Sequence, residues 1–226
     1  MNPRPVAGFV LLLCSFLNGC QEQSWESAMA AGHAAVQQGN YAEAERIYLA
    51  AVKKAEEFGR EDPRVALTLT QLAQVYAGQG KHVEAEPVYL QALNIYQSAY
   101  GENHLDVAAT LNNLGVLHRL YGQYEQAEPL LTRALAIKER LLGPRHVDVA
   151  LSLANLAQLN VSRGLPEKAE PLYRRVLAIR QEALGPSHPE VAKTLEDMAN
   201  VLRKLGRQQE AMTMDLQARD IRAKRS

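Results

Sequence analysis

Residues 111–137 read LNNLGVLHRLYGQYEQAEPLLTRALAI, and this stretch decides the fold. Its first half places Leu111, Leu114 and Leu117 three residues apart, which is the spacing of an amphipathic helix. Gly122 then interrupts the pattern. A second apolar stripe with helical spacing begins at Ala127. The stretch therefore predicts two helices joined by a short turn.

The same helix pair recurs along the chain with a period of 42 residues. Four segments align without gaps: Ala66–Val107, Ala108–Val149, Ala150–Val191 and the shorter Ala192–Ser226. Each contains a glycine followed five residues later by an alanine, and an earlier unit opening at Trp25 repeats this interval one residue out of step. A repeat of this length indicates a solenoid of stacked helix pairs.

Small residues occupy the positions where the two helices of a unit should cross. Gly115 and Ala127 hold these positions in the quoted stretch. A larger side chain there would push the helices apart, so we expect tight packing at these positions. The neighbouring units place alanines there: Ala73, Ala85, Ala157 and Ala169.

The Gly-x-Tyr-x-x-Ala turn and the helix pairs resemble the tetratricopeptide repeat. The longer unit, and phrases such as LGPSHPEVAKTL at residues 184–195, resemble its kinesin light chain subclass. The resemblance implies an all-α, right-handed superhelical solenoid of about five antiparallel helix pairs. The repeats would span residues 25–65, 66–107, 108–149, 150–191 and 192–226, with a C-terminal cap in the last.

Histidines recur in the linkers between repeats, at the position that Asp62 holds in the first linker. Asp suits a helix N-cap. Equivalent residues of successive repeats should lie roughly 10 Å apart or more, whereas zinc ligands lie about 2 Å from a shared metal. We therefore predict helix caps or linker structure, and no metal site, at His104, His146 and His188.

Two further features distinguish the ends of the helices. Glu-Pro pairs at Pro87, Pro129 and Pro171 fall near the start of each second helix, where proline is least costly. The last repeat turns polar where its predecessors are apolar, with Asp215 and Arg219 at positions held by Tyr or Leu. A terminal repeat has no successor to cover it, so this predicts a capping helix.

Polar side chains along the first helices are candidates for binding. The resemblance implies that these helices line a concave groove, in which an Asn hydrogen-bonds the backbone of an extended peptide. A carboxamide offers both a donor and an acceptor to a peptide group. The alternative is that these positions are only solvated polar residues. The candidates are Gln71, Asn113, Asn155 and Asp197, followed three residues later by Gln74, Gln158 and Asn200.

The first twenty residues indicate export. Arg4 precedes an uncharged, mainly apolar run of 12 residues, Val6–Leu17. The run is shorter than the roughly 20 residues that span a bilayer and suits a secretory signal. Leu17, Gly19 and Cys20 resemble the lipobox of bacterial lipoproteins, which implies a signal peptide over residues 1–19 and lipidation of Cys20.

The short segment after Cys20 predicts where an anchor would hold the protein. Residues 20–24 would form a lipidated N-terminus and a short linker of at most about 14 Å when extended. Gln21 after the cysteine implies, by the same resemblance, retention at the outer membrane facing the periplasm.

The composition excludes several classes of function. Lys plus Arg and Asp plus Glu are equal at 25 each, so no basic surface predicts nucleic-acid binding. No phosphate-binding loop, HExxH zinc motif or nucleophile elbow occurs, so we expect no enzyme and no cofactor. The expected function is a lipid-anchored scaffold in the bacterial envelope that binds a protein or an extended peptide. A cytosolic kinesin light chain-like adaptor and a non-catalytic accessory subunit of an envelope enzyme remain alternatives.

Overall fold

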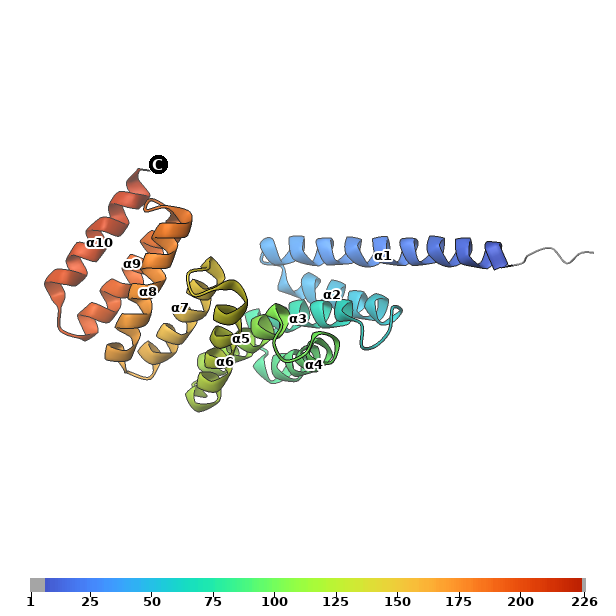
Figure 1. Ribbon diagram of the computed structural model, residues 1–226, viewed down its shortest axis with the longest axis horizontal. Coiled ribbons are helices and arrows are strands. Elements are labelled where there is room, and N and C mark those ends of the chain that lie inside the picture. Colours follow the sequence, from blue (N-terminus) through green and yellow to red (C-terminus); the bar gives the residue numbers. More distant parts are fainter. Residues whose placement is uncertain (1–6, 225–226) are drawn as a thin grey trace, which may run out of the picture. The chain divides into compact units, whose positions relative to one another are not determined.

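The computed structural model describes residues 7–224, with the side chains of residues 21–224, and is all-helical over this range (Figure 1). Ten helices follow one another there: α1 (Ala7–Gln37), α2 (Tyr41–Glu56), α3 (Pro63–Gly78), α4 (His82–Tyr100), α5 (Leu105–Leu120), α6 (Tyr124–Leu142), α7 (Val147–Ser162), α8 (Pro166–Leu184), α9 (Pro189–Lys204) and α10 (Gln208–Ala223). Consecutive helices pack as antiparallel pairs, as the repeat pattern predicts.

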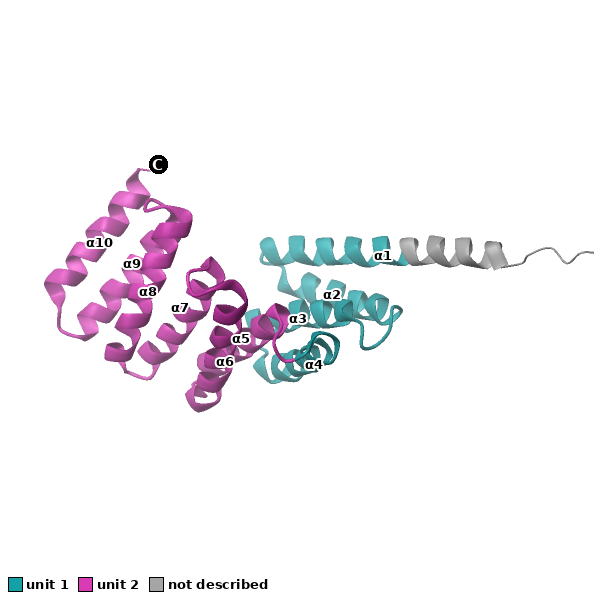
Figure 2. Cartoon of the chain, viewed as in Figure 1, with its two compact units in different colours: residues 1–101 teal, residues 102–226 magenta. Residues whose placement is uncertain are grey.

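The chain divides into two compact units, which are described separately (Figure 2). Unit 1 covers residues 1–101 and holds the pairs α1–α2 and α3–α4. Unit 2 covers residues 102–226 and holds the pairs α5–α6, α7–α8 and α9–α10. Within each unit, the second helix of one pair also packs against the first helix of the next pair.

The linker residues begin the first helices as N-caps. The Asp62 carboxylate accepts a hydrogen bond from the backbone N–H of Arg64 at 2.9 Å. The Nδ1 atoms of His104, His146 and His188 accept equivalent bonds from the second residue of α5, α7 and α9, at 3.3, 3.1 and 3.2 Å. The prediction that the recurring histidines are caps is confirmed. They satisfy backbone donors that a helix start leaves free.

The small residues lie where the two helices of a pair approach most closely. Ala127 has no exposed surface, and a Cβ added to Gly115 would lie 2.6 Å from Leu131 Cγ. The turn between α5 and α6 needs glycine for a different reason, because Gly122 adopts a φ of +76° that favours this residue. Packing and turn geometry thus fix the two positions that mark each repeat.

The prolines of the Glu-Pro pairs lie slightly deeper in their helices than the first turn. Counted from His82, Pro87 is the sixth residue of α4, and Pro129 and Pro171 hold the same place in α6 and α8. The glutamate before each proline has a separate role between repeats. Glu170 binds Arg207 of the next repeat at 2.8 Å, and Glu128 pairs with Arg163 in the same way.

The last helix, α10, carries the expected polar substitutions. Asp215 is half-buried and pairs with Arg203, whereas Arg219 is exposed. Arg222 binds Glu196 of α9 at 2.7 Å. Charged side chains thus stand where α4, α6 and α8 bury apolar ones.

The N-terminal segment differs from the extended link expected before Trp25. Gln21–Ser24 lie within α1, and a helix rises only about 1.5 Å per residue. The predicted lipidation site, Cys20, lies outside the side chains that the structure describes. Within the described residues, no helix combines the length and the apolar character needed to cross a bilayer.

Candidate peptide-binding face

The first helices of unit 2 bring several of the predicted binding residues together. Asn113 lies on α5 and Asn155 on α7, and both side chains are half-buried. Asn155 Nδ2 donates a 3.0 Å hydrogen bond to Oδ1 of Asn112, which is only 6% exposed. One N–H of Asn155 is therefore used inside the protein. Its second N–H and its carbonyl oxygen make no further bond among the described residues.

A second group of side chains gathers around the hydroxyl of Tyr173 on α8. Burial raises the pKa of Tyr173, and the nearby Asp197 carboxylate raises it further. The Gln158 side chain hydrogen-bonds this hydroxyl, which acts in the opposite direction. Asp197 also meets Lys193 Nζ at 3.4 Å, one helical turn away on α9. Gln158 and Asp197 thus come together at one tyrosine, while Asn200 is exposed on α9.

In unit 1 the candidate residues lie on α3. Gln71 is half-buried and Gln74 is exposed. The first helices of this unit are held together by Trp25 of α1, whose Nε1 donates a 2.9 Å hydrogen bond to Thr68 Oγ1 of α3. The face that carries Gln71 and Gln74 is therefore built on a fixed α1–α3 contact.

Comparison with protein families agrees with this arrangement. The family model described as the tetratricopeptide repeat matches residues 26–98, 64–140, 122–182 and 148–224. These matches cover most of the chain. This chain belongs to the tetratricopeptide repeat family. Members of this family are typically non-catalytic scaffolds that bind proteins or peptides, and the described residues of this tetratricopeptide protein contain no group of three His, Cys, Asp or Glu able to hold a metal ion.

Solved structures place this tetratricopeptide protein near kinesin light chain-like members. BtubC (BKLC) from P. vanneervenii is 25% identical, with a TM-score of 0.76, and the match covers 91% of this chain and 89% of that chain. Kinesin light chain TPR-like repeats from Podosopora anserina are also 25% identical, with a TM-score of 0.74, covering 89% and 96%. The predicted resemblance to kinesin light chain repeats is confirmed.

A third structure shares the fold at lower identity. The Rap conjugation gene regulator of plasmid pLS20, solved in complex with the Phr* peptide, is 18% identical with a TM-score of 0.72. The match covers 99% of this chain and 60% of that chain. No curated protein matches this chain.

The structure also shows polar residues that the sequence pattern does not reveal. Arg180 of α8 is 7% exposed and donates to Thr194 Oγ1 at 2.8 Å and to the Glu190 carboxylate at 2.8 Å. Lys138 occupies the same repeat position in α6 and lies 3.5 Å from the carbonyl oxygen of Asp148. Burial lowers the pKa of Lys138, and the Asp148 carboxylate opposes this change. These cations connect one tetratricopeptide repeat to the next.

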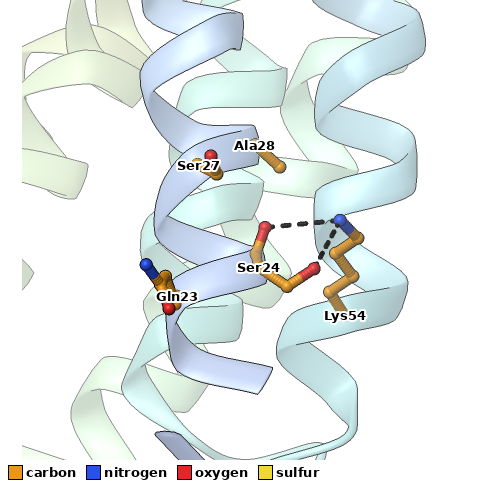
Figure 3. A pocket seen from close by; sticks show the side chains of 5 residues that line it. All are labelled: Gln23, Ser24, Ser27, Ala28 and Lys54. Atoms are coloured by element: carbon orange, nitrogen blue, oxygen red, sulfur yellow. Dashed lines mark hydrogen bonds between the residues drawn. The ribbon is translucent and has the colours of Figure 1, made fainter. Parts of the chain in front are cut away.

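One shallow hollow lies away from the candidate face, between α1 and α2 (Figure 3). Gln23, Ser24, Ser27, Ala28 and Lys54 line it. Lys54 Nζ donates to the Ser24 hydroxyl at 2.9 Å and to the Ser24 carbonyl oxygen at 3.3 Å. The cation is thus engaged in holding α1 against α2.

Proposed function

We propose that this tetratricopeptide protein is a lipid-anchored scaffold that binds an extended peptide, or an extended segment of a partner protein, along α5, α7 and α9. The observation that carries this proposal is the pair of half-buried carboxamides on neighbouring first helices, Asn113 and Asn155. The complex of the structurally similar Rap regulator with the Phr* peptide supports a peptide as the ligand.

The spacing of the repeats suits an extended chain. First helices of successive repeats lie about 10 Å apart, and an extended peptide advances about 3.3 Å per residue. Equivalent carboxamides should therefore meet peptide groups about three residues apart. Because Asn155 already donates to Asn112, its carbonyl oxygen is free to accept from a peptide N–H, while Asn113 retains both functions.

Peptide binding is tested with pools of random nonapeptides and the double variant Asn113→Ala/Asn155→Ala. Asn94→Ala is the matched control, because Asn94 is exposed on α4, a second helix. We expect the double variant to retain much less peptide than the wild-type protein, and the control to retain as much. Equal retention by the double variant and the wild type would remove these residues from the binding face.

The lipid anchor is tested separately in bacterial cells. We propose attachment through Cys20 and retention at the outer membrane facing the periplasm, on the strength of the N-terminal sequence. Palmitate labelling should be lost in Cys20→Ala and kept in Cys14→Ala, which alters the other cysteine. An alkaline phosphatase fusion to the first 30 residues should be active. An inactive fusion and an unlabelled wild-type protein would favour the cytosolic adaptor instead.

A further inference from the structure

Arg119, near the end of α5, is a half-buried cation for which the described residues supply no counter-ion. Its Nε is buried and makes no hydrogen bond, and the described part of the chain gives the guanidinium no ion pair. Burial lowers its pKa, and its electrostatic neighbours are the hydroxyls of Tyr173 and Tyr124 rather than a carboxylate. A charge withdrawn from water in this way is costly unless an anion compensates it.

The other well-buried cations of unit 2 have partners inside the protein. Arg180 binds both the Thr194 hydroxyl and the Glu190 carboxylate. Lys138 lies beside the Asp148 backbone carbonyl and close to its carboxylate. These two side chains serve the junctions between repeats. Arg119 has no comparable contact, so a role in holding the fold does not account for it.

Arg119 borders the candidate peptide-binding face. It lies within electrostatic range of Tyr173, the hydroxyl that Gln158 hydrogen-bonds. Gln158 stands one turn after Asn155 on α7, so the guanidinium lies beside the side chains proposed to hold a peptide. All of these residues belong to unit 2.

We propose that Arg119 binds a carboxylate of the peptide on this face, a step that rests on the proposed function. A guanidinium offers two parallel N–H donors that match the two oxygens of a carboxylate. A single arginine also balances a single negative charge. A doubly charged phosphate would need a second cation, and the nearest lysine on α9, Lys193, is paired with Asp197. The carboxylate comes from an Asp or Glu side chain or from a peptide C-terminus.

The first part of the test separates a binding role from a structural one. Arg119→Gln and Arg119→Leu should unfold at a temperature equal to or higher than that of the wild type, because each removes an uncompensated charge. Arg140→Gln is the matched control, since Arg140 is exposed on α6. A clear fall in melting temperature for both Arg119 variants, with the control unchanged, would show that Arg119 supports the fold and would overturn the proposal.

The second part measures the preference for a carboxylate. The probes are random nonapeptide pools with blocked ends and either Glu or Gln fixed at one position, and a further pair that differs only in a free or amidated C-terminus. We expect the wild type to favour the carboxylate pool of one pair by about tenfold, as a buried charge-assisted hydrogen bond allows. Arg119→Gln should reduce this ratio to about one, and Arg119→Lys should keep part of it.

The outcomes separate the two proposals. If the wild type binds both members of every pair equally, while Asn113→Ala/Asn155→Ala loses them, only the assignment of Arg119 fails. An Arg119→Gln variant that keeps the wild-type ratio also overturns it. If the wild type binds no pool, the proposed peptide function fails as well. The pair that shows the preference identifies the carboxylate as a side chain or a C-terminus.

Discussion

The packing of Gly115 against Leu131 gives a stability prediction with a definite sign. In Gly115→Ala the new Cβ would lie 2.6 Å from Leu131 Cγ, 2.8 Å from its Cδ2 and 3.3 Å from the Ala127 carbonyl oxygen. Carbon atoms in ordinary contact are about 3.5–4.0 Å apart, so the overlap approaches 1 Å. Leu131 and Ala127 are fully buried, and neither has open space to move into.

Two opposing effects set the size of the change. Replacing glycine by alanine inside a helix is favourable by about 0.8–1 kcal/mol. Overfilling a packed core costs about 1–3 kcal/mol. Because the clash involves both a branched carbon and a backbone oxygen, we expect the upper part of that range. The free energy of unfolding should therefore fall by about 1–2 kcal/mol.

Urea titrations followed by far-UV circular dichroism measure this effect, provided that the m-value is unchanged. The same substitution in a Leu131→Ala background should instead be neutral or stabilising by up to about 1 kcal/mol, because the clashing atoms are gone. Gly78→Ala is the control, since its Cβ would meet only the partly exposed ring of Tyr41. A Gly115→Ala variant as stable as the wild type, or equally destabilised in both backgrounds, would refute the packing argument.

Three further predictions concern polar contacts and are measured by the same titrations. Arg180→Ala should lower the free energy of unfolding by about 2–3 kcal/mol, because it leaves buried polar groups unpaired, whereas Arg174→Ala, at an exposed pair, should change it by less than about 1 kcal/mol. His146→Ala should cost about 1 kcal/mol and His146→Asp much less, because Asp caps the equivalent helix in the first linker. Arg174 and then Arg207 hold the pKa of the Glu170 carboxyl below its usual value, so the stabilisation is present above the unfolded pKa and lost as the pH falls through the folded one. Glu170→Gln should therefore be destabilising at neutral pH and progressively less so in acid; a difference from wild type that does not change with pH would contradict this.

The fold could be predicted from the sequence because each repeat states its structure locally. Apolar spacing defines the helices, glycine ends the first helix of each pair, and the linker Asp and His residues cap the next one. Each of these signals depends on residues within one helical turn of one another, which the chain order alone places together. The 42-residue period then multiplies the signal, so that an error in one repeat would be exposed by the others.

The polar contacts of the binding face could not be predicted in the same way. Asn112 and Asn113 are adjacent in sequence, yet Asn112 is buried against Asn155 whereas Asn113 is half-buried and makes no such bond. The contact joins residues 43 positions apart, one more than the repeat period. Which of two neighbouring carboxamides meets the next helix depends on how far one helix is rotated against the other. Periodicity fixes the order of the helices and leaves this rotation undetermined.

The junctions between repeats show how nearly identical backbones acquire different chemistry. Thr68, Thr110, Ser152 and Thr194 occupy one repeat position and are all buried. Thr68 accepts from Trp25 and Thr194 from Arg180, whereas the Ser152 hydroxyl is buried without a hydrogen-bond partner. The cation before it, Lys138, approaches the Asp148 carbonyl instead. Each junction therefore depends on its own pair of side chains, and a repeat moved to another place would leave a buried polar group unpaired. The order of the repeats is consequently part of what the sequence encodes, and with it the order in which Asn113, Asn155 and Asp197 are presented to a ligand.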